Sequence, residues 1–442
     1  MHCVPTRVLL AFFLVFVAGG AAAKDEPARS NKATHARASA DYNQSAVARS
    51  KACGPVNSKT MVYEVKDYWH GLTQCMRQLR DVWNHGGPDT LRTISGKKVR
   101  IQDLVRNQIV SELQKPYVRF YSNKDKGNAK GLTYAEVVDA EFKIKPGIER
   151  VALTNSIGVP YNGMGQSGMA YFLSQFARLS KKAGGEIGMR DAAFYRSIAM
   201  LSVNTLLTDT TEGGLATSVK CDKSPELQCT WFHSVTRRDL PSIAGGTLNQ
   251  NLHVVRDLGL IADSMNDTST EKKRINNAVR AGVNQLVFSN GHVGANTSPN
   301  FADFLSAPVG IGKVHWLYYG VRVDNDKKGG YFLNSKGKDC GYQMHVLDLL
   351  SSILARAEKL NELPDEFKSC SASAASAYQT ILAVDATPNV QKNWSANDGR
   401  DYQCNDVTRK ATRKSKFLNK LYGSCAWNES LDKELTKSPS GP

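Results

Sequence analysis

The sequence predicts a mainly α-helical protein that forms an (α/α) toroid, an incomplete barrel of helical hairpins with short strands in the loops. Apolar residues recur every three or four positions over most of residues 161–360, which is typical of helices buried on one side. Loops rich in Gly, Asn and Pro separate these stretches. Runs typical of strands are short and lie only between the predicted helices.

Five helices are expected in the middle of the chain, at 165–182, 191–207, 248–265, 271–288 and 341–360. In the first, Met169, Phe172 and Phe176 fall on one face. Strands are expected at 315–323 and 330–333. The N-terminal part, 61–148, also reads as mostly helical. Its clearest apolar face consists of Trp69, Leu72, Met76, Leu79 and Trp83.

Residues 1–23 have the three parts of a secretory signal. These are a basic residue, Arg7, an apolar run over 8–18 and small residues that end at Ala23. We expect cleavage near Ala23, with a membrane anchor as the alternative. No other stretch reaches the roughly 18 apolar residues of a membrane-spanning helix. The protein is therefore expected to be secreted, or periplasmic in a bacterium, without stable membrane association.

The remaining chain is expected to hold one large domain. Residues 24–55 are polar and lack periodicity, which indicates a disordered leader. The toroid is expected over 56–430, and 431–442 reads as a flexible tail.

Eight of the nine cysteines remain once Cys3 leaves with the signal. An even number in an exported chain favours disulfides, and we expect the local pairs Cys221–Cys229 and Cys404–Cys425. No Cys-x-x-Cys or His-x-x-x-His spacing occurs, so neither a metal nor another cofactor is predicted. Five sequons would carry glycans in a eukaryotic host: Asn43, Asn266, Asn296, Asn393 and Asn428.

The net charge of +16, or +15 without Arg7, favours a polyanionic partner. Nucleic acid, an anionic membrane surface and an acidic glycan all fit this charge. Export favours an acidic polysaccharide over nucleic acid, although a secreted nuclease and simple solvated lysines stay open as alternatives. The sequence predicts no oligomeric state.

Four segments place polar and aromatic residues in glycine-rich loops where a core does not need them. The candidates in these segments are Tyr161, Asn162 and Gln166, then His233, Arg237 and Arg238, then Asn249 and His253, and finally Tyr319, Arg322, Tyr342 and His345.

The order of these segments resembles the C-terminal domain of the glucuronyl C5-epimerases. The string Asn162-Gly163-Met164-Gly165-Gln166 is similar to that family's Gly-Met-Ala-Gln-Gly motif. Trp231-Phe232 and Leu248-Asn249 are similar to its Trp-Phe-Glu-Glu-Tyr-Pro and Leu-Asn-Gly stretches. Tyr319-Gly320-Val321-Arg322 resembles its Tyr-Asp-Leu-Arg segment, and Gly341-Tyr342-Gln343-Met344-His345 its Tyr-His-x-x-His helix. The resemblance spans residues 161–354 and implies a toroid that acts on uronates.

Three departures from that family favour a related α/α-toroid polysaccharide lyase. His233 stands where the family has Glu, the spacing after Tyr342 is one residue shorter, and no β-rich domain precedes the helices. A C5-epimerase-like enzyme and a non-catalytic protein that binds acidic glycans are the alternatives.

Both reactions begin with removal of the C5 proton beside the uronate carboxylate, which requires a cation or strong donor at that carboxylate. Arg322 or Asn249 is expected to supply it. Tyr342, with His253 or His233, is expected to act as base and acid. The expected substrate contacts are Tyr161, Asn162, Gln166, Arg237, Arg238, Tyr319 and His345.

Other enzyme classes fit the sequence less well. The paired carboxylates of a glycosidase have no clear location, because the polar loops are poor in Asp and Glu, and Asp239 and Glu212 are the nearby acids to test. Neither a Gly-x-Ser-x-Gly motif nor a phosphate-binding loop occurs.

Overall fold

The computed structural model describes residues 53, 55–57, 59–64, 70–94, 96–122, 131–154, 160, 162–222, 224–233, 248–265, 268–288 and 340–364. All of them belong to the unit Ser50–Pro442. The expected signal, tail, two strands at 315–323 and 330–333, and Cys404–Cys425 pair lie outside the described residues. Within the expected leader, Cys53 is described and is buried.

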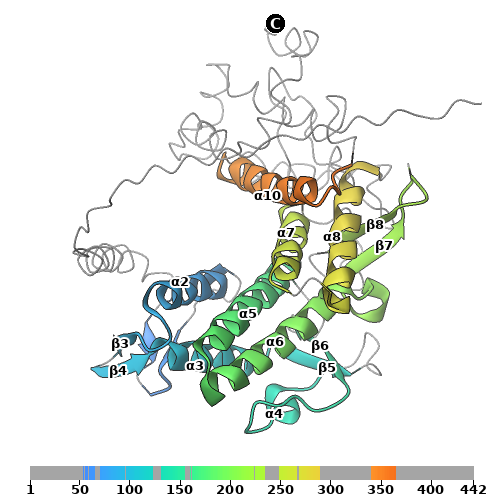
Figure 1. Ribbon diagram of the computed structural model, residues 1–442. Coiled ribbons are helices and arrows are strands. Elements are labelled where there is room, and N and C mark those ends of the chain that lie inside the picture. The colour runs from blue at the N-terminus through green and yellow to red at the C-terminus, as the bar shows by residue number, and fades with distance from the viewer. Residues whose placement is uncertain are drawn as a thin grey trace, which may run out of the picture. The chain divides into compact units, whose positions relative to one another are not determined.

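The prediction of a mainly helical fold is confirmed for the described residues. All five helices expected in the middle of the chain are present: α5 (Gly163–Ala183), α6 (Gly185–Leu207), α7 (Leu248–Asp263), α8 (Thr270–Phe288) and α10 (Cys340–Lys359). Before them lie α2 (His70–Gly86), α3 (Ile101–Leu113) and the single turn α4 (Tyr134–Val137), as Figure 1 shows.

The described strands form four antiparallel hairpins. They are β1 (Val56–Asn57) with β2 (Val62–Tyr63), β3 (Leu91–Ile94) with β4 (Lys97–Arg100), β5 (Val118–Ser122) with β6 (Ile148–Leu153), and β7 (Ala216–Lys220) with β8 (Gln228–Phe232). The reading of 61–148 as mostly helical is therefore wrong for the strands in that region. Trp231 and Phe232, expected in a loop, lie in β8 and are about 1% exposed. A strand buried on both faces lacks the alternation that identifies a strand in sequence.

Helices α5 and α6 form an antiparallel hairpin. Gly184 and Gly185 make the turn with φ of 72° and 65°, a left-handed conformation that glycine adopts without steric cost. At the turn, a Cβ on Gly188 would lie 2.7 Å from the carbonyl oxygen of Ser180. At the far end, the hydroxyl of Ser202 donates to the carbonyl of Gln166 at 3.1 Å.

Helices α7 and α8 form a second antiparallel hairpin. A Cβ on Gly282 would lie 2.7 Å from the Val255 side chain, so the two backbones approach closely there. Near the turn, Arg356 of α10 donates to both Asp263 of α7 and Asn276 of α8. The final turns of α7 and α10 therefore lie together.

The two hairpins contact each other through α5 and α7. A Cβ on Gly163 would lie 3.5 Å from Val254, and one turn further along both helices Ser167 donates to Asp257 at 2.9 Å. Since these contacts advance in the same sense, α5 and α7 run in the same general direction. Helix α10 contacts α7 and α8 in turn. The described helices do not close into a ring, and none of them is long and apolar enough to cross a membrane.

The main hydrophobic core lies between these helices and the β7–β8 hairpin. Trp231 and Phe232 of β8 pack among buried side chains of α7, including Leu252 and Leu258. Leu349 of α10 belongs to the same cluster, which joins the last described helix to the core.

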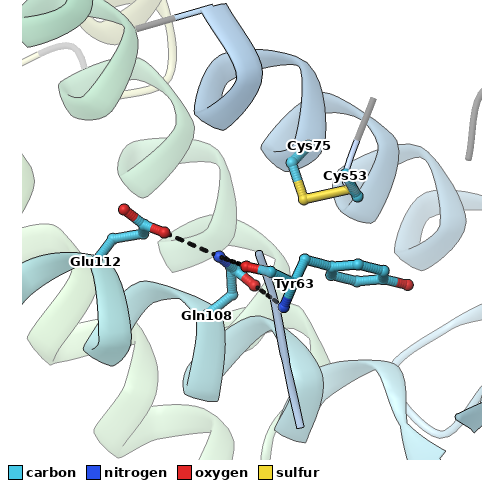
Figure 2. Close-up of a disulfide and its surroundings, with 5 residues drawn as sticks. All are labelled: Cys53, Tyr63, Cys75, Gln108 and Glu112. Carbon is cyan, nitrogen blue, oxygen red and sulfur yellow. Dashed lines mark hydrogen bonds between the residues drawn. A yellow bond between two sulfur atoms is a disulfide. The ribbon is translucent and has the colours of Figure 1, made fainter. Parts of the chain in front are cut away.

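Two disulfides join cysteines within the part of the chain that the structure describes. Cys221–Cys229 closes the β7–β8 hairpin and confirms the predicted pair. Cys53–Cys75 joins the segment before β1 to α2 and was not predicted. Figure 2 shows a second attachment nearby, in which Gln108 of α3 accepts from the Tyr63 amide at 2.8 Å and donates to Glu112. The N-terminal hairpin is thus held to the helices by the Cys53–Cys75 disulfide and by the hydrogen bond between Tyr63 and the Gln108 side chain.

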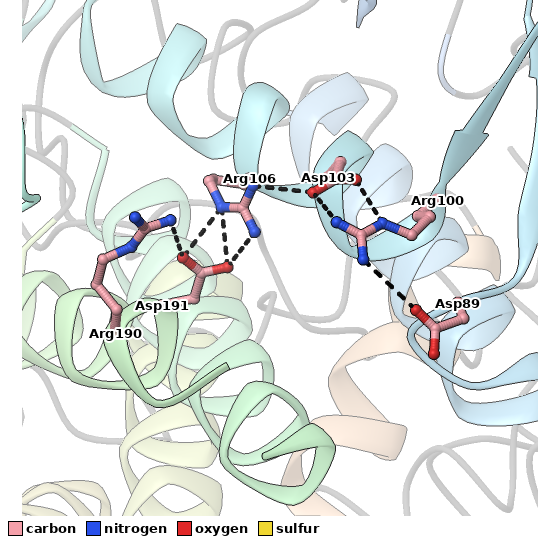
Figure 3. Close-up of polar contacts among 6 residues, drawn as sticks. All are labelled: Asp89, Arg100, Asp103, Arg106, Arg190 and Asp191. Atoms are coloured by element: carbon pink, nitrogen blue, oxygen red, sulfur yellow. Dashed lines mark hydrogen bonds and ion pairs between the residues drawn. The ribbon is translucent and has the colours of Figure 1, made fainter. Parts of the chain in front are cut away.

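A chain of ion pairs joins α3 to α6 (Figure 3). Asp191 is 1% exposed and accepts from Arg106 at 2.7 Å, while Arg190 lies 3.5 Å away. Arg106 also contacts Asp103, which binds Arg100. Burial alone would raise the pKa of Asp103, but hydrogen bonds from Arg100 and Arg106 outweigh it and lower that pKa.

Candidate functional site

Three segments that carry predicted site residues meet at one place. The first turn of α5, the middle of α7 and the end of β8 are in contact, although 86 positions separate Gly163 from Asn249. A Cβ on Gly163 would lie only 2.5 Å from the carbonyl oxygen of His233, so glycine is required for this approach. The amide of Phe232 donates to Asn251 at 3.0 Å and joins β8 to α7. We call this region the α5–α7–β8 junction: Asn162, Gly163, Ser167, His233, Asn249, His253, Arg256 and Asp257.

His233 is fixed directly after β8. Its backbone N–H donates to the carbonyl of Leu215 at 2.7 Å. Its Nε2 lies 2.9 Å from the hydroxyl oxygen of Thr217 on the neighbouring strand. The half-buried ring is therefore held by β7 at the edge of the junction.

Asn162 and Gln166 have structural partners. Asn162 is the N-cap of α5, with a left-handed φ of 64°, and its side chain accepts from the amide of Gly165. Gln166 is fully buried and accepts from the Leu153 amide at 2.8 Å. It also donates to the Val151 carbonyl at 2.7 Å. The side-chain amide thus bonds the edge of β6 that does not pair with β5, as a neighbouring strand would. Gln166 therefore presents no surface to a sugar.

Asn249 lies inside the first turn of α7, which begins at Leu248. Its buried Oδ1 and the Oε1 of Gln250 make no hydrogen bond with the residues that the structure describes. These two carbonyl groups are the unmatched acceptors at the start of this helix.

A polar network crosses from α5 to α7 within the junction. The Ser167 hydroxyl donates to Oδ2 of Asp257 at 2.9 Å. Arg256 donates to Oδ1 of the same carboxylate from Nε at 3.0 Å and from Nη2 at 2.7 Å. Nη2 also lies 2.9 Å from Nδ1 of His253. Because a guanidinium can only donate, Nδ1 accepts, and the neutral imidazole carries its proton on Nε2.

Asp257 is the most deeply buried charge of this network, with 2% of the residue exposed. Burial raises the pKa of its carboxyl. The positive charge and hydrogen bonds of Arg256, the Ser167 hydroxyl and the charge of Arg77 oppose this shift without cancelling it. The carboxyl cannot reach a substrate from this position, but it fixes the guanidinium that covers it.

Two predicted residues, Tyr342 and His345, belong to the first turns of α10, which packs against α7. The described structure includes the backbone of these turns. Tyr161, Arg237, Arg238, Tyr319 and Arg322 lie outside the described residues.

Three residues of this network were not predicted from the sequence: Ser167, Arg256 and Asp257. A usable signal was present, because His253, Arg256 and Asp257 follow the spacing i, i+3, i+4 and share one helix face. An acidic residue between Val255 and Leu258 also interrupts the apolar stripe of α7.

A second polar feature adjoins an apolar pocket between α2, α3, β5, β6 and α5. Its walls include Met169, Phe172 and Phe176, and Glu112 and Tyr117 lie at its polar end. The cavity volume is about 30 Å³, on the scale of one water molecule. Burial raises the pKa of Glu112, against the hydrogen bond from Tyr117. The pocket is too narrow for a sugar ring.

No group of three His, Cys, Asp or Glu side chains that could hold a metal ion occurs among the described residues. In comparisons with known proteins, the chain matches no protein-family model, no curated protein and no solved structure.

Proposed function

We propose that the protein is an exported polysaccharide lyase that cleaves uronate-containing acidic polysaccharides, with the α5–α7–β8 junction as part of its catalytic cleft. The observation that carries this proposal is that residues predicted separately for catalysis lie in segments that contact each other. His233 was selected in one segment of the chain and Asn249 and His253 in another, and the fold brings the two segments into contact. A polar network with a partly exposed arginine occupies the same junction.

The reaction is a β-elimination. A base removes the C5 proton, a double bond forms between C4 and C5, and the C4–O bond breaks. The electron pair goes to the leaving oxygen, which takes a proton from an acid. A cation at the carboxylate stabilises the intermediate charge.

The tautomer of His253 suggests how these roles are divided. With Nδ1 accepting from Arg256, neutral His253 holds its proton on Nε2, so in this state it is suited to hydrogen-bond the leaving oxygen and not to remove the C5 proton. Tyr342 at the start of α10, or His233, is then the base, and the protonated base returns its proton to the leaving oxygen. Asn249, with an unmatched carbonyl in the first turn of α7, is suited to orient a sugar hydroxyl.

The proposal extends to the arrangement of the helical hairpins. The α5–α6 and α7–α8 hairpins are antiparallel and adjacent, with α5 and α7 running in the same direction. We infer that they are two repeats of an (α/α) toroid and that α10 begins the next one. The apolar N-terminus, the two disulfides and the high positive charge support export and capture of an acidic glycan.

The test uses the purified mature chain with alginate, glucuronan, heparosan, hyaluronan and pectate. A lyase produces the ultraviolet absorbance of an unsaturated uronate on at least one polymer. Deuterium uptake from solvent at C5 without that absorbance would identify a C5-epimerase instead. Absence of both on every polymer would refute catalysis on these substrates and favour a glycan-binding protein.

Variants on two helices test the assigned site. His253→Gln should lower the rate about a hundredfold, since one positioned donor at a developing negative charge contributes about that much. The matched control is His85→Gln, an exposed histidine in the last turn of α2. Equal rates in both variants would remove His253 from the mechanism.

A further inference from the structure

We propose that Arg256 forms a preorganised binding site for the carboxylate of a single uronate residue. This inference rests on the proposed function for the identity of the polymer, and it adds a residue that the sequence analysis did not select.

The guanidinium of Arg256 is fixed from two sides. Nε and Nη2 donate to Asp257, and Nη2 also donates to His253. Asp257 is itself held by the hydroxyl of Ser167 from α5. An arginine side chain normally loses considerable rotamer entropy when it binds a ligand, and this arrangement has removed that freedom in advance.

One nitrogen of the guanidinium, Nη1, remains available. Nη1 of Arg256 makes no hydrogen bond with the residues that the structure describes, and 26% of the side chain is exposed. The carboxylate beneath it has a side-chain exposure of only 3%. A ligand at this surface therefore meets the cation, while the negative charge that anchors the cation is shielded from it.

The local charge favours an anion whatever the protonation state of Asp257. Arg77 of α2 is close enough to act on the pKa of that carboxyl. Two arginines therefore lie within electrostatic range of this one acidic group, and the three residues together carry a net positive charge. An ordinary one-to-one ion pair would be neutral and would attract an anion weakly.

A sugar carboxylate can accept a hydrogen bond from Nη1, and the opposite charges strengthen such a bond. In a uronate, this contact would also withdraw charge from the group next to C5, where the proposed reaction needs stabilisation. The site would then bind substrate and favour proton removal.

The experiment measures binding without turnover. Glucuronate, glucose and sulfate are titrated into the mature protein at constant ionic strength, with ligand-observed NMR or calorimetry as the readout. Glucuronate should bind through Arg256, and glucose, which lacks the carboxylate, should bind at least tenfold more weakly. Arg256→Gln should weaken glucuronate binding at least tenfold, as expected for losing a hydrogen bond between charged groups.

Two further variants keep the result interpretable. Arg100→Gln is the matched control, because Arg100 also pairs with an aspartate but lies on the distant α3 network. Arg256→Lys retains the charge without the planar donors, and should lose most of the affinity even if the glutamine variant folds poorly. Circular dichroism and urea unfolding check the fold of each variant.

The outcomes separate this inference from the proposed function. Glucuronate binding that depends on Arg256, in a protein that degrades no polymer, would support the site and refute the lyase. Equal affinity in the Arg256 and Arg100 variants would overturn the site even if lyase activity is found. Sulfate that binds through Arg256 as tightly as glucuronate would overturn the assignment to a carboxylate.

Discussion

Replacing Gln166 with methionine tests whether this residue supports the fold or contacts a substrate. Methionine has a similar length, so the change removes the amide without leaving a large cavity. The native amide accepts from Leu153 and donates to Val151 and Ser202, and Gln166 is fully buried. We expect the variant to fold and to be clearly less stable.

The expected loss of stability follows from the hydrogen bonds that each partner of Gln166 retains in the variant. The Leu153 amide loses its acceptor, which costs about 1–3 kcal/mol for a buried donor. The Val151 carbonyl still accepts from Thr205, and the Ser202 hydroxyl still donates to the backbone of residue 166. Those two losses cost about 1 kcal/mol each, and the added apolar contact of methionine offsets roughly 1 kcal/mol. The free energy of unfolding should fall by about 2–4 kcal/mol.

Urea unfolding, followed by circular dichroism, measures this change. Gln175→Met serves as the control, because Gln175 lies on the same helix and its side chain accepts from Arg178 near the surface. The control should change stability by less than about 0.5 kcal/mol. A Gln166 variant with unchanged stability and weaker polysaccharide binding would refute the structural role and restore Gln166 as a substrate contact.

Three further predictions concern stability. Asp191→Asn should cost about 2–4 kcal/mol in urea unfolding, because it removes the buried carboxylate that pairs with both Arg106 and Arg190, whereas Asp89→Asn at an exposed pair should cost less than about 1 kcal/mol; similar losses would contradict this. Burial raises the pKa of Glu112, so native protein binds that proton more tightly and stability should fall as pH rises from 4.5 through the raised pKa. Glu112→Gln should reduce that fall between pH 4 and 7, and an unchanged pH profile would refute it. Serine at Cys221 and Cys229 should cost about 2–3 kcal/mol for this short loop, and a change below 1 kcal/mol would show that the bond constrains the unfolded chain little.

Part of the candidate site could be predicted from the sequence. Helical periodicity and loop composition drew attention to His233, Asn249 and His253, and the structure brings their segments together. The same reasoning selected Asn162 and Gln166, whose polar groups serve a helix cap and a strand edge. A polar residue before a helix has the same appearance in sequence whether it binds a sugar or the backbone.

The rest of the site depends on contacts between distant segments. Ser167 and Asp257 are 90 positions apart, and nothing local to either residue indicates their hydrogen bond. The significance of Arg256 appears only when that buried carboxylate is seen beneath it. Sequence spacing could have placed Arg256 and His253 on one face, but it could not have shown which side of α7 faces α5.

The sequence by itself determined the helices and the hairpin disulfide, because both depend on near neighbours in the chain. Apolar spacing fixed the five central helices to within a few residues, with one start, that of α6, several residues earlier than expected. The closeness of Cys221 and Cys229 suggested their bond. Tertiary structure alone decided that Trp231 and Phe232 form a buried strand, that Gln166 completes the edge of β6, and that one buried aspartate fixes Arg256. The physical reason is that burial and pairing of polar groups are settled by whichever segments pack together, and local periodicity carries no record of those partners.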